Sequence, residues 1–339
     1  MRFDVTIAGA GPAGLVAAIL VARAGARVAL AAGPSVRKPR PGESLPGAGV
    51  RLLARLGLPV PAAGGPHRRL TGIASAWDGE WVETDYLRSP DGPAWLLDRP
   101  AFDGALAAAA SEAGAVFIKI AGRAEREGNV WRLGEEAEAE FLIDSTGRSA
   151  AFARRLGART RVDHDLVALW AVAEGEAPLR LDRPLIERDG AGWWYAVRLC
   201  EGRTYAALHV EASAAAGARA PDSWTARLRS TRFLAPLVAA AGPFGAPLGS
   251  PAGGSRLEPC RGEGWAACGD AAMAFDPLSS QGLLGAMAGG HMLARALLAE
   301  DREKALADYE GRLGEIGRLY RDRREAYYRR PSEGWDPRG

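Results

Sequence analysis

The chain opens with the stretch DVTIAGAGPAGLVAAILVARAGARVAL, residues 4–30, in which a short apolar strand leads into spaced glycines and an alanine-rich helix. A second apolar strand follows at 27–31. Gly9, Gly11 and Gly14 indicate a dinucleotide-binding turn because this strand–turn–helix–strand context surrounds them. The first glycine allows the tight turn, the second lets a diphosphate approach the backbone, and the third lets helix and strand pack closely.

The first residues of the predicted helix carry the binding chemistry. Pro12, Ala13 and Gly14 lie where backbone N–H groups lack partners within a helix and the helix dipole is positive. We expect these groups to bind phosphates; the alternative is an ordinary βαβ turn without a ligand. The second strand ends at Ala32 without the acidic residue that commonly binds the adenosine ribose. Either another group binds that ribose, or the nucleotide binds more weakly than usual.

The composition is that of an ordinary globular protein, with 339 residues, 47% hydrophobic and 25% charged. A net charge of +2 gives no reason to expect nucleic acid or an anionic membrane as a partner. The three cysteines lack CxxC spacing and the four histidines are scattered, which predicts no metal site and a reducing, cytoplasmic setting. No apolar run approaches the roughly 18 residues that span a membrane.

The other elements are predicted from the spacing of apolar residues. Strands are expected at 72–77, 80–86, 94–97, 116–120, 129–133, 139–143, 166–173, 192–199, 204–210 and 264–268. Helices are expected at 50–56, 98–113, from 149 to 156, at 223–228, after Pro277 and at 302–329. A proline-rich loop at 34–46 and a Pro/Gly-rich linker at 242–254 separate some of them.

This order predicts an α/β fold in which a β-sheet lobe interrupts a Rossmann-like domain. The nucleotide-binding domain is expected to comprise 1–75, 98–160 and 255–300. The β-sheet substrate domain is expected at 76–97 and 161–254, and C-terminal helix and tail at 301–339.

Several separated motifs now line up along the chain. They are GAGPAG at 9–14, DR at 98–99, DSTGR at 144–148, GDAA at 269–272 and DPLSSQG at 276–282. Together they resemble the FAD-dependent aromatic hydroxylase superfamily, which is built like p-hydroxybenzoate hydroxylase and also includes tryptophan halogenases and geranylgeranyl reductases. The resemblance runs from residue 1 to about 330 and implies FAD as the cofactor.

The late motifs then acquire roles from this resemblance. Asp270 would bind ribityl hydroxyls of FAD, or it is simply the N-cap of a helix. The loop that would lie along the flavin pyrimidine edge contains Pro277, Ser279, Ser280, Gln281 and Gly282. Backbone N–H groups at such a helix start stabilise the charge of reduced flavin, whereas the alternative is a plain capped helix start.

Further candidates precede the middle of the chain. Arg99 resembles the family arginine that reaches FAD, although by itself it would be a surface ion-pair partner. Arg148 is expected to meet a phosphate or to hold a strand end. Glu43 and Ser44, in the GESLP loop at 42–46, are candidates beside the isoalloxazine, the alternative being a proline-stiffened surface turn.

The branch within the superfamily is indicated by GWWYAV at 192–197, which matches a halogenase signature only in part. A halogenase also needs a lysine after the GESLP loop, and none occurs between Lys38 and Lys119, so halogenation is not expected. The PGESLP, GWWY and DPLSSQG stretches, with the tyrosine-rich segment 320–328 and Trp335, are more similar to flavoproteins that mature quinone-cofactor enzymes by hydroxylating a peptidyl tryptophan.

The substrate pocket is expected in the β-sheet lobe. Strand alternation puts Trp193 and Tyr195 on one face and Trp194 on the other. One set would line a pocket for a planar aromatic substrate, although core packing explains any single one of them equally well. His209 would be a base or a satisfied sheet histidine.

The expected function is therefore an FAD-dependent monooxygenase that hydroxylates an electron-rich aromatic ring through a flavin C4a-hydroperoxide. Its partners would be O2, an aromatic small molecule or peptide, and either NAD(P)H or a partner flavin reductase as electron source. A substrate protein carrying the tryptophan is a further expected partner. The alternatives are a reductase or dehydrogenase of the geranylgeranyl reductase type, or a flavin-binding or partner-binding protein without catalysis.

Overall fold

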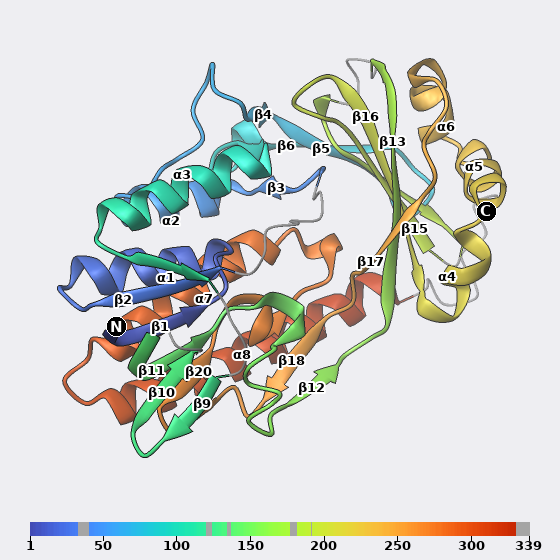
Figure 1. Ribbon diagram of the computed structural model, residues 1–339. Helices are drawn as coiled ribbons and strands as arrows, with labels where there is room; N and C mark the ends of the chain where they lie inside the picture. The colour runs from blue at the N-terminus through green and yellow to red at the C-terminus, as the bar shows by residue number, and fades with distance from the viewer. Residues whose placement is uncertain (33–40, 120–123, 134–136, 177–181, 191, 330–339) are drawn as a thin grey trace.

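The computed structural model describes residues 1–32, 41–119, 124–133, 137–176, 182–190 and 192–329, and it has the predicted α/β fold with two large sheets (Figure 1). Residues 34–40 of the proline-rich loop and Trp335 lie outside the described residues. The first sheet runs in the order β19 (Arg261–Gly262), β20 (Trp265–Ala267), β11 (Ala137–Asp144), β1 (Arg2–Ala8), β2 (Val28–Ala32) and β8 (Val116–Lys119), and β10 (Val130–Leu133) and β9 (Ala124–Glu127) extend it from β11. Its central pairs are parallel, as expected of a Rossmann-like domain.

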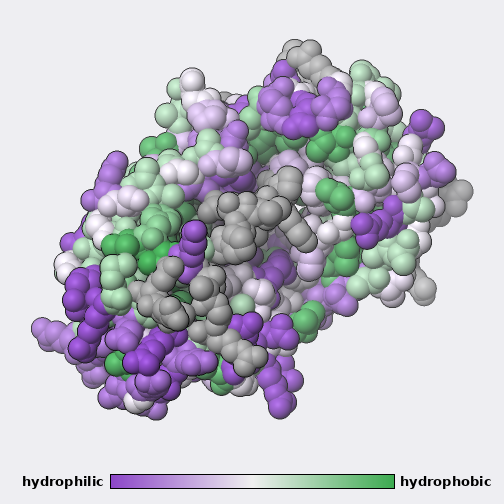
Figure 2. All heavy atoms as spheres, in the orientation of Figure 1, coloured by the Kyte–Doolittle hydropathy of each residue, from purple (hydrophilic) through white to green (hydrophobic). Residues whose placement is uncertain are grey.

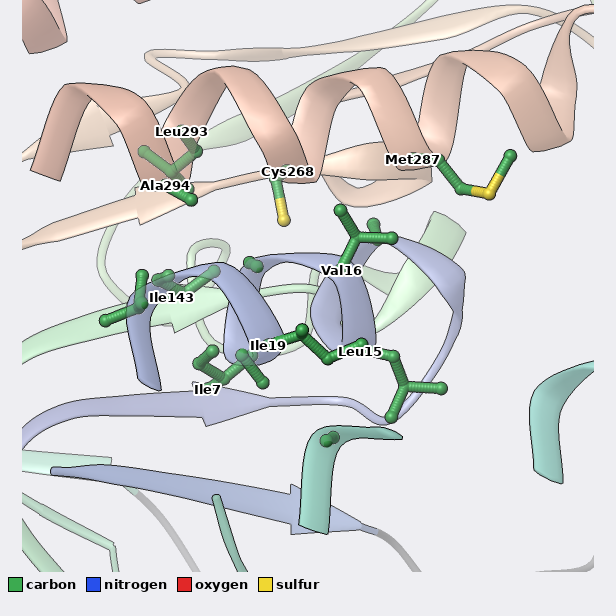
Figure 3. Close-up of a cluster of buried hydrophobic side chains, with 14 of the residues drawn as sticks. Ile7, Leu15, Val16, Ile19, Ile143, Cys268, Met287, Leu293 and Ala294 are labelled. Carbon is green, nitrogen blue, oxygen red and sulfur yellow. The ribbon is translucent and has the colours of Figure 1, made fainter. Parts of the chain in front are cut away.

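Helices contribute buried side chains to the hydrophobic cluster on one face of this sheet. They are α1 (Pro12–Arg23), α2 (Gly47–Arg55), α3 (Arg99–Glu112), α7 (Gly282–Leu297) and α8 (Arg302–Tyr328). Helix α1 lies between β1 and α7, with Ile19 on the sheet side and Val16 toward α7 (Figure 3). Because α1 is enclosed on both sides, it is apolar around almost its whole circumference rather than amphipathic.

The second large sheet is formed by β17 (Leu248–Pro251), β13 (Leu166–Glu176), β16 (Arg203–Glu211), β15 (Gly192–Arg198), β14 (Leu185–Asp189), β5 (Gly72–Ala76) and β6 (Val82–Asp85), in that order. The helices α4 (Ala212–Ala218), α5 (Pro221–Arg229) and α6 (Leu234–Val238) cover its outer face (Figure 1). Its inner face is turned toward the first sheet and its helices. We call it the inner face from here on.

Two three-stranded sheets complete the fold. One contains β3 (Ser44–Leu45), β7 (Ala94–Leu96) and β4 (Arg68–Leu70), and the other contains β12 (Arg159–Val162), β18 (Ser255–Glu258) and β21 (Met273–Ala274). Leu70 and Leu96 of the former share a buried cluster with Val197 and Tyr205 of the inner face. This packing brings the loop that precedes β3 against the large sheet.

The structure corrects three expectations. The α-helix expected at 149–156 is absent: Ser149 ends a 3₁₀ turn (Gly147–Ser149) and residues 151–157 form turns, because the Asp144 carboxylate accepts hydrogen bonds from the N–H groups of Phe152 and Ala153. Part of the expected linker at 242–254 is strand β17, which pairs with β13. The long helix α7 begins at Gly282, after a 3₁₀ turn at Pro277–Ser279.

Candidate functional site

The glycine turn between β1 and α1 is held by backbone contacts that exclude side chains. Gly9 has φ +113°, and a Cβ there would lie 2.4 Å from the carbonyl oxygen of Ser145. A Cβ on Gly14 would lie 2.1 Å from the Gly9 carbonyl oxygen. The Ser145 hydroxyl donates a hydrogen bond of 2.7 Å to that same oxygen. Gly9 and Gly14 are therefore required by the packing of this turn itself.

Gly11 serves a different purpose. Its φ of −86° is open to any residue, and a Cβ there would meet no atom of the described residues within 4 Å. Gly11 is the N-cap of α1, Pro12 is the first helical residue, and among the described residues no side chain caps the helix. The free N–H groups of the first turn thus lie beside open space, which fits a diphosphate group bound at a helix N-terminus.

The late Gly-Asp motif meets the glycine turn at Ala13. Gly269 has φ +61°, and a Cβ on it would lie 2.6 Å from the Ala13 Cβ. A Cβ on Gly290 in α7 would lie 2.2 Å from the Ala13 carbonyl oxygen. Asp270 follows Gly269, and its half-buried carboxylate lies 3.9 Å from the Nε of Arg148. The two sequence motifs, more than two hundred residues apart, therefore converge on the first turn of α1.

The loop at 276–282 leaves the start of α7 open. The Asp276 carboxylate accepts a hydrogen bond from the Leu278 N–H (2.7 Å), and the Ser279 hydroxyl donates to the Asp276 carbonyl oxygen (2.7 Å). Four of the remaining loop residues are exposed: Pro277, Ser280, Gln281 and Gly282. Among the described residues, a Cβ on Gly282 would meet nothing within 4 Å and no side chain caps α7, although the Gln281 N–H donates a hydrogen bond of 3.3 Å to the Ser279 hydroxyl. A helix N-terminus beside open space fits the anionic edge of a reduced flavin.

Arg99 and Glu43 are brought together. Arg99 is buried at the start of α3, where it forms ion pairs with Glu43 and with Asp103, the latter at 3.1 Å. Its helix is capped by Asp98, whose carboxylate accepts a hydrogen bond of 2.9 Å from the Ala101 N–H. Arg99 therefore anchors the loop before β3, and it is not a surface residue.

The inner face holds the other side of that loop. The Tyr195 hydroxyl donates a hydrogen bond of 3.0 Å to the Gly42 carbonyl oxygen. Gly42 has φ +79°, and a Cβ there would lie 2.8 Å from the Tyr205 ring. Ser44 pairs with Leu96 in the small sheet. The segment from Gly42 to Ser44 thus bridges the nucleotide-binding part and the large sheet.

The DSTGR motif at 144–148 holds neighbouring backbone segments together. Both carboxylate oxygens of Asp144 accept hydrogen bonds, from Thr146 and from the backbone of the following turn. Arg148 donates to the carbonyl oxygens of Gly253 and of Phe275, the latter at 2.9 Å. Of the two predicted roles of Arg148, the structure therefore displays the one that holds neighbouring segments together.

The aromatic strand divides as its alternation predicts. Trp194 points to the outer face, where its Nε1 donates to the Asp189 carboxylate (3.0 Å) and its ring packs against Trp224 of α5. Trp193 and Tyr195 lie on the inner face. Trp194 is thus part of the core under α5, and the pocket candidates reduce to the inner-face residues.

His209 lies directly against Trp193. The two rings are stacked, with centroids 3.6 Å apart and planes 7° from parallel, and both are buried. Burial lowers the pKa of His209 to about 4, with the nearby Asp276 charge opposing this effect. The imidazole is therefore neutral at physiological pH, and its Nδ1 has no hydrogen-bond partner among the described residues.

Sequence reasoning missed a cluster around Asp276. Its buried carboxylate accepts hydrogen bonds from the Tyr328 hydroxyl (2.8 Å) and lies 3.1 Å from the His164 Nε2. Arg324 of α8 is 3.8 Å away. The signal was the Asp that opens the DPLSSQG motif, together with the tyrosines that end the last helix.

Strand β2 ends at Ala32. The neighbour of Ala32 in register on β8 is Lys119, so the adjacent strand ends on a basic residue. In the described ranges, no group of three His, Cys, Asp or Glu side chains could hold a metal ion. Nor does any helix in these ranges have the length and apolar character needed to cross a bilayer.

Two surface hollows lie away from the converging motifs. One, of about 360 Å³, is lined by polar side chains of the β15–β16 turn and β13, including Arg203 and Glu174. Hydrophilic atoms gather at this end of the large sheet in Figure 2. The other, of about 550 Å³, lies among Arg2, Glu140 and Arg302 near the opposite end of the first sheet. Neither hollow contains a residue of the predicted site.

The chain is similar over its whole length to known flavoproteins, although no protein-family model matches it. LodB of Marinomonas mediterranea, named as an FAD-dependent oxidoreductase, is 27% identical over 350 residues, which cover 97% of this chain and 93% of LodB. Digeranylgeranylglycerophospholipid reductase of Methanoculleus marisnigri is 28% identical over 335 residues, covering 87% and 76% of the two chains.

Solved structures show the same fold. The myxobacterial chondrochloren halogenase CndH, an FAD-dependent halogenase, aligns with a TM-score of 0.85 at 21% identity, over 98% of this chain and 84% of that one. PqsL of Pseudomonas aeruginosa, solved in complex with 2-aminobenzoylacetate, aligns with a TM-score of 0.80 at 20% identity, over 95% and 94%. These structures show that the chain has the fold of FAD-dependent halogenases and monooxygenases, and the full-length similarity to LodB supports an enzyme that uses FAD.

Proposed function

We propose that this enzyme is an FAD-dependent monooxygenase that hydroxylates an electron-rich aromatic ring, such as an indole or a peptidyl tryptophan. The observation that carries the proposal is the convergence at Ala13 of the glycine turn, Gly269 and α7, opposite an aromatic inner face. Bound FAD would supply the electrons that activate O2. The first sheet with its helices binds FAD in this proposal, and the second sheet binds the substrate.

The chain's own residues would orient the cofactor. The N–H groups at the start of α1, next to Gly11, bind the diphosphate, and Asp270 binds ribityl hydroxyls. The Gly282 N–H faces the pyrimidine edge and favours negative charge there, beside the Gln281 N–H, which also donates to the Ser279 hydroxyl at 3.3 Å. Glu43 and Ser44 lie beside the flavin ring, in the segment that Arg99 and Tyr195 hold from its two sides.

The inner face would receive the substrate ring. Trp170 and Tyr195 flank the small Ala207 in one row across three strands. Trp193 lies in the neighbouring row, stacked on His209. Aromatic walls around a small residue favour a flat aromatic ring by stacking and edge contacts. The buried neutral His209 stabilises no charge, which suits an electrophilic hydroxylation that needs no strong base.

A second candidate function is reduction of an isoprenoid double bond. The observation that favours it is the likeness to digeranylgeranylglycerophospholipid reductase over 87% of this chain. A long chain substrate needs an extended apolar channel, whereas the inner face carries tyrosine hydroxyls and indole N–H groups. We therefore rank hydroxylation first.

The test is oxygen consumption by the FAD-loaded protein. The protein is supplied with NAD(P)H, or with a flavin reductase and NADH, and O2 uptake is followed with and without indoles and tryptophan-containing peptides. The proposal expects uptake stimulated by substrate and a product that has gained one oxygen atom by mass spectrometry. Anaerobic loss of a double bond from a geranylgeranyl lipid, without oxygenation of any indole, would instead support the reductase.

A further inference from the structure

A single hydroxyl links the inner face to the loop at the start of α7. Tyr328, in the last turn of α8, accepts a hydrogen bond of 2.9 Å from the Trp193 Nε1 and donates one of 2.8 Å to the Asp276 carboxylate. Trp193 belongs to the substrate-facing sheet, and Asp276 begins the loop that leads to Gly282. The hydrogen bonds thus run without a break between two regions that the proposed function assigns to substrate and flavin.

At one end of this series of hydrogen bonds, the Asp276 carboxylate is buried and has several partners. Its side chain is 1% exposed. Besides Tyr328, it contacts the Leu278 N–H and the His164 ring, with Arg324 nearby. A buried carboxylate that loses a hydrogen-bond donor loses part of the compensation for its burial, which is costly in a low-dielectric setting. Its exact position also fixes the turn that carries the exposed residues 280–282.

The Trp193 end is equally constrained. The indole is 2% exposed and stacked on His209, so its N–H cannot turn to water. The Tyr328 ring is held by an edge contact with Trp77 at 5.6 Å and by the Arg324 guanidinium at 4.6 Å. We therefore expect the ring to keep its position when the hydroxyl is removed, so that a Tyr328→Phe substitution tests the hydroxyl alone.

We propose that Tyr328 is a positioning residue that couples Trp193 of the substrate-facing sheet to the flavin-facing loop through Asp276. It touches neither proposed ligand, and it acts by holding the Asp276 carboxylate and the loop in the arrangement that favours reduced FAD. The inference rests on FAD binding at the start of α7. Removing the hydroxyl leaves more uncompensated negative charge near that loop and loosens its N–H groups. Both changes disfavour an anionic reduced flavin, so the midpoint potential should become more negative.

The test compares Tyr328→Phe with Tyr309→Phe in the FAD-loaded full chain. Tyr309 lies on the same helix and also loses one buried hydrogen bond, but its hydroxyl donates to the Ala267 carbonyl oxygen at the end of β20 (2.8 Å) and not to Asp276. We expect both variants to bind FAD and to melt at lower temperature. Only Tyr328→Phe should shift the flavin midpoint potential to more negative values in a dye-coupled reductive titration.

A second variant tests the coupling itself and does not depend on the first. Trp193→Phe keeps a ring on His209 but removes the N–H donor, and should shift the potential in the same direction by a smaller amount. If the hydrogen bonds act in series, the double variant should match Tyr328→Phe rather than the sum of the two shifts.

Unchanged potentials in both Tyr328→Phe and Trp193→Phe, or strictly additive shifts, would overturn the coupling. Shifts as expected in a protein that oxygenates no aromatic substrate would uphold it while refuting the monooxygenase assignment. Failure of the wild-type protein to bind FAD would overturn both.

Discussion

The glycine turn at the start of α1 and the inner face of the large sheet are built by opposite means. The turn consists of backbone: Gly9 and Gly14 leave no room for a Cβ, and Gly11 lies beside open space. The inner face consists of side chains from distant strands, such as Trp193 and His209, stacked across a strand pair. A site made of backbone leaves a local signature in the sequence, whereas a site made of side chains depends on strand register.

The segment from Gly42 to Ser44 lies where these two regions meet. From one side Arg99 pairs with Glu43, and from the other Tyr195 donates to the Gly42 carbonyl oxygen. The two regions are therefore not independent. Side-chain contacts to this segment join the backbone-built glycine turn to the aromatic inner face.

Arg99→Met should have the largest effect of the substitutions considered. It tests whether a single side chain contributes strongly to the stability of the region that is built mainly from backbone. Removing the guanidinium leaves the buried Asp103 carboxylate without this cation. Breaking a buried ion pair costs about 3–5 kcal/mol. We expect a loss of that size in the unfolding free energy, measured by urea denaturation.

Its control is Arg51→Met, which removes an exposed ion pair with Asp91. An exposed pair contributes roughly 0–1 kcal/mol, so this variant should unfold almost as the wild type does. Equal losses in the two variants would show that Arg99 is no more than a surface partner.

Gly14→Ala and Gly11→Ala separate packing from binding within the turn. The Gly14 Cβ would meet a carbonyl oxygen at 2.1 Å, so we expect a loss of about 3 kcal/mol in stability together with lost FAD binding. The Gly11 Cβ would meet no atom of the described part of the chain, so Gly11→Ala should keep wild-type stability and weaken FAD binding alone. FAD fluorescence titration and thermal melting measure the two properties, and unchanged affinity in Gly11→Ala would place the diphosphate elsewhere.

Much of this architecture could be predicted from local pattern. The glycines, the parallel strands around them and the opposite orientation of Trp193 and Trp194 follow from backbone geometry and strand period. Strand β17 could not be predicted, because Leu248–Pro251 is defined by pairing with β13, a tertiary contact that a Pro/Gly-rich stretch does not reveal. The loss of the helix expected at 149–156 could not be predicted for a similar reason. The Asp144 carboxylate accepts hydrogen bonds from N–H groups that a helix would use.

The Asp276 cluster was out of reach for a different reason. Its partners come from two distant places: His164 precedes β13, whereas Arg324 and Tyr328 lie four residues apart on α8, and no sequence pattern links the two places to Asp276. Likewise Arg99 could be recognised as a candidate, but its burial with Glu43 depends on how α3 packs over the loop before β3. Sequence pattern predicts where chain segments turn, and the tertiary fold decides which side chains then meet.

The pH dependence of the unfolding free energy tests how strongly His209 is buried in the inner face. The pKa of His209 is lowered to about 4 by burial, against 6.5 for a free imidazole. As pH falls from 6.5 toward 4, the unfolded chain binds a proton that the folded protein excludes, so the unfolding free energy falls. The total loss of unfolding free energy caused by His209 is roughly 3 kcal/mol at low pH, and this loss is absent above pH 6.5.

His209→Phe supplies the reference for that measurement. It keeps a ring against Trp193 and removes the titrating group, so the difference in unfolding free energy between wild type and variant should change across this pH window. Urea denaturation at several pH values between 4 and 7.5 measures it. A constant difference would mean that His209 titrates in the folded protein with the same pKa as in the unfolded chain, contrary to its burial.

Tyr195→Phe should have the smallest effect, and it tests the junction. The substitution removes one hydrogen bond to the Gly42 carbonyl oxygen and keeps the ring contact with Tyr205 at 6.1 Å. One neutral hydrogen bond contributes about 1 kcal/mol, so the stability loss should be of that order. Because the bond joins the two regions, we also expect faster proteolytic cleavage near residue 42, whereas Trp170→Phe, which loses a hydrogen bond to Ser250 within the large sheet, should not show it. Equal protection of residue 42 in both variants would mean that Arg99 alone holds the segment, and that the two regions are joined from one side only.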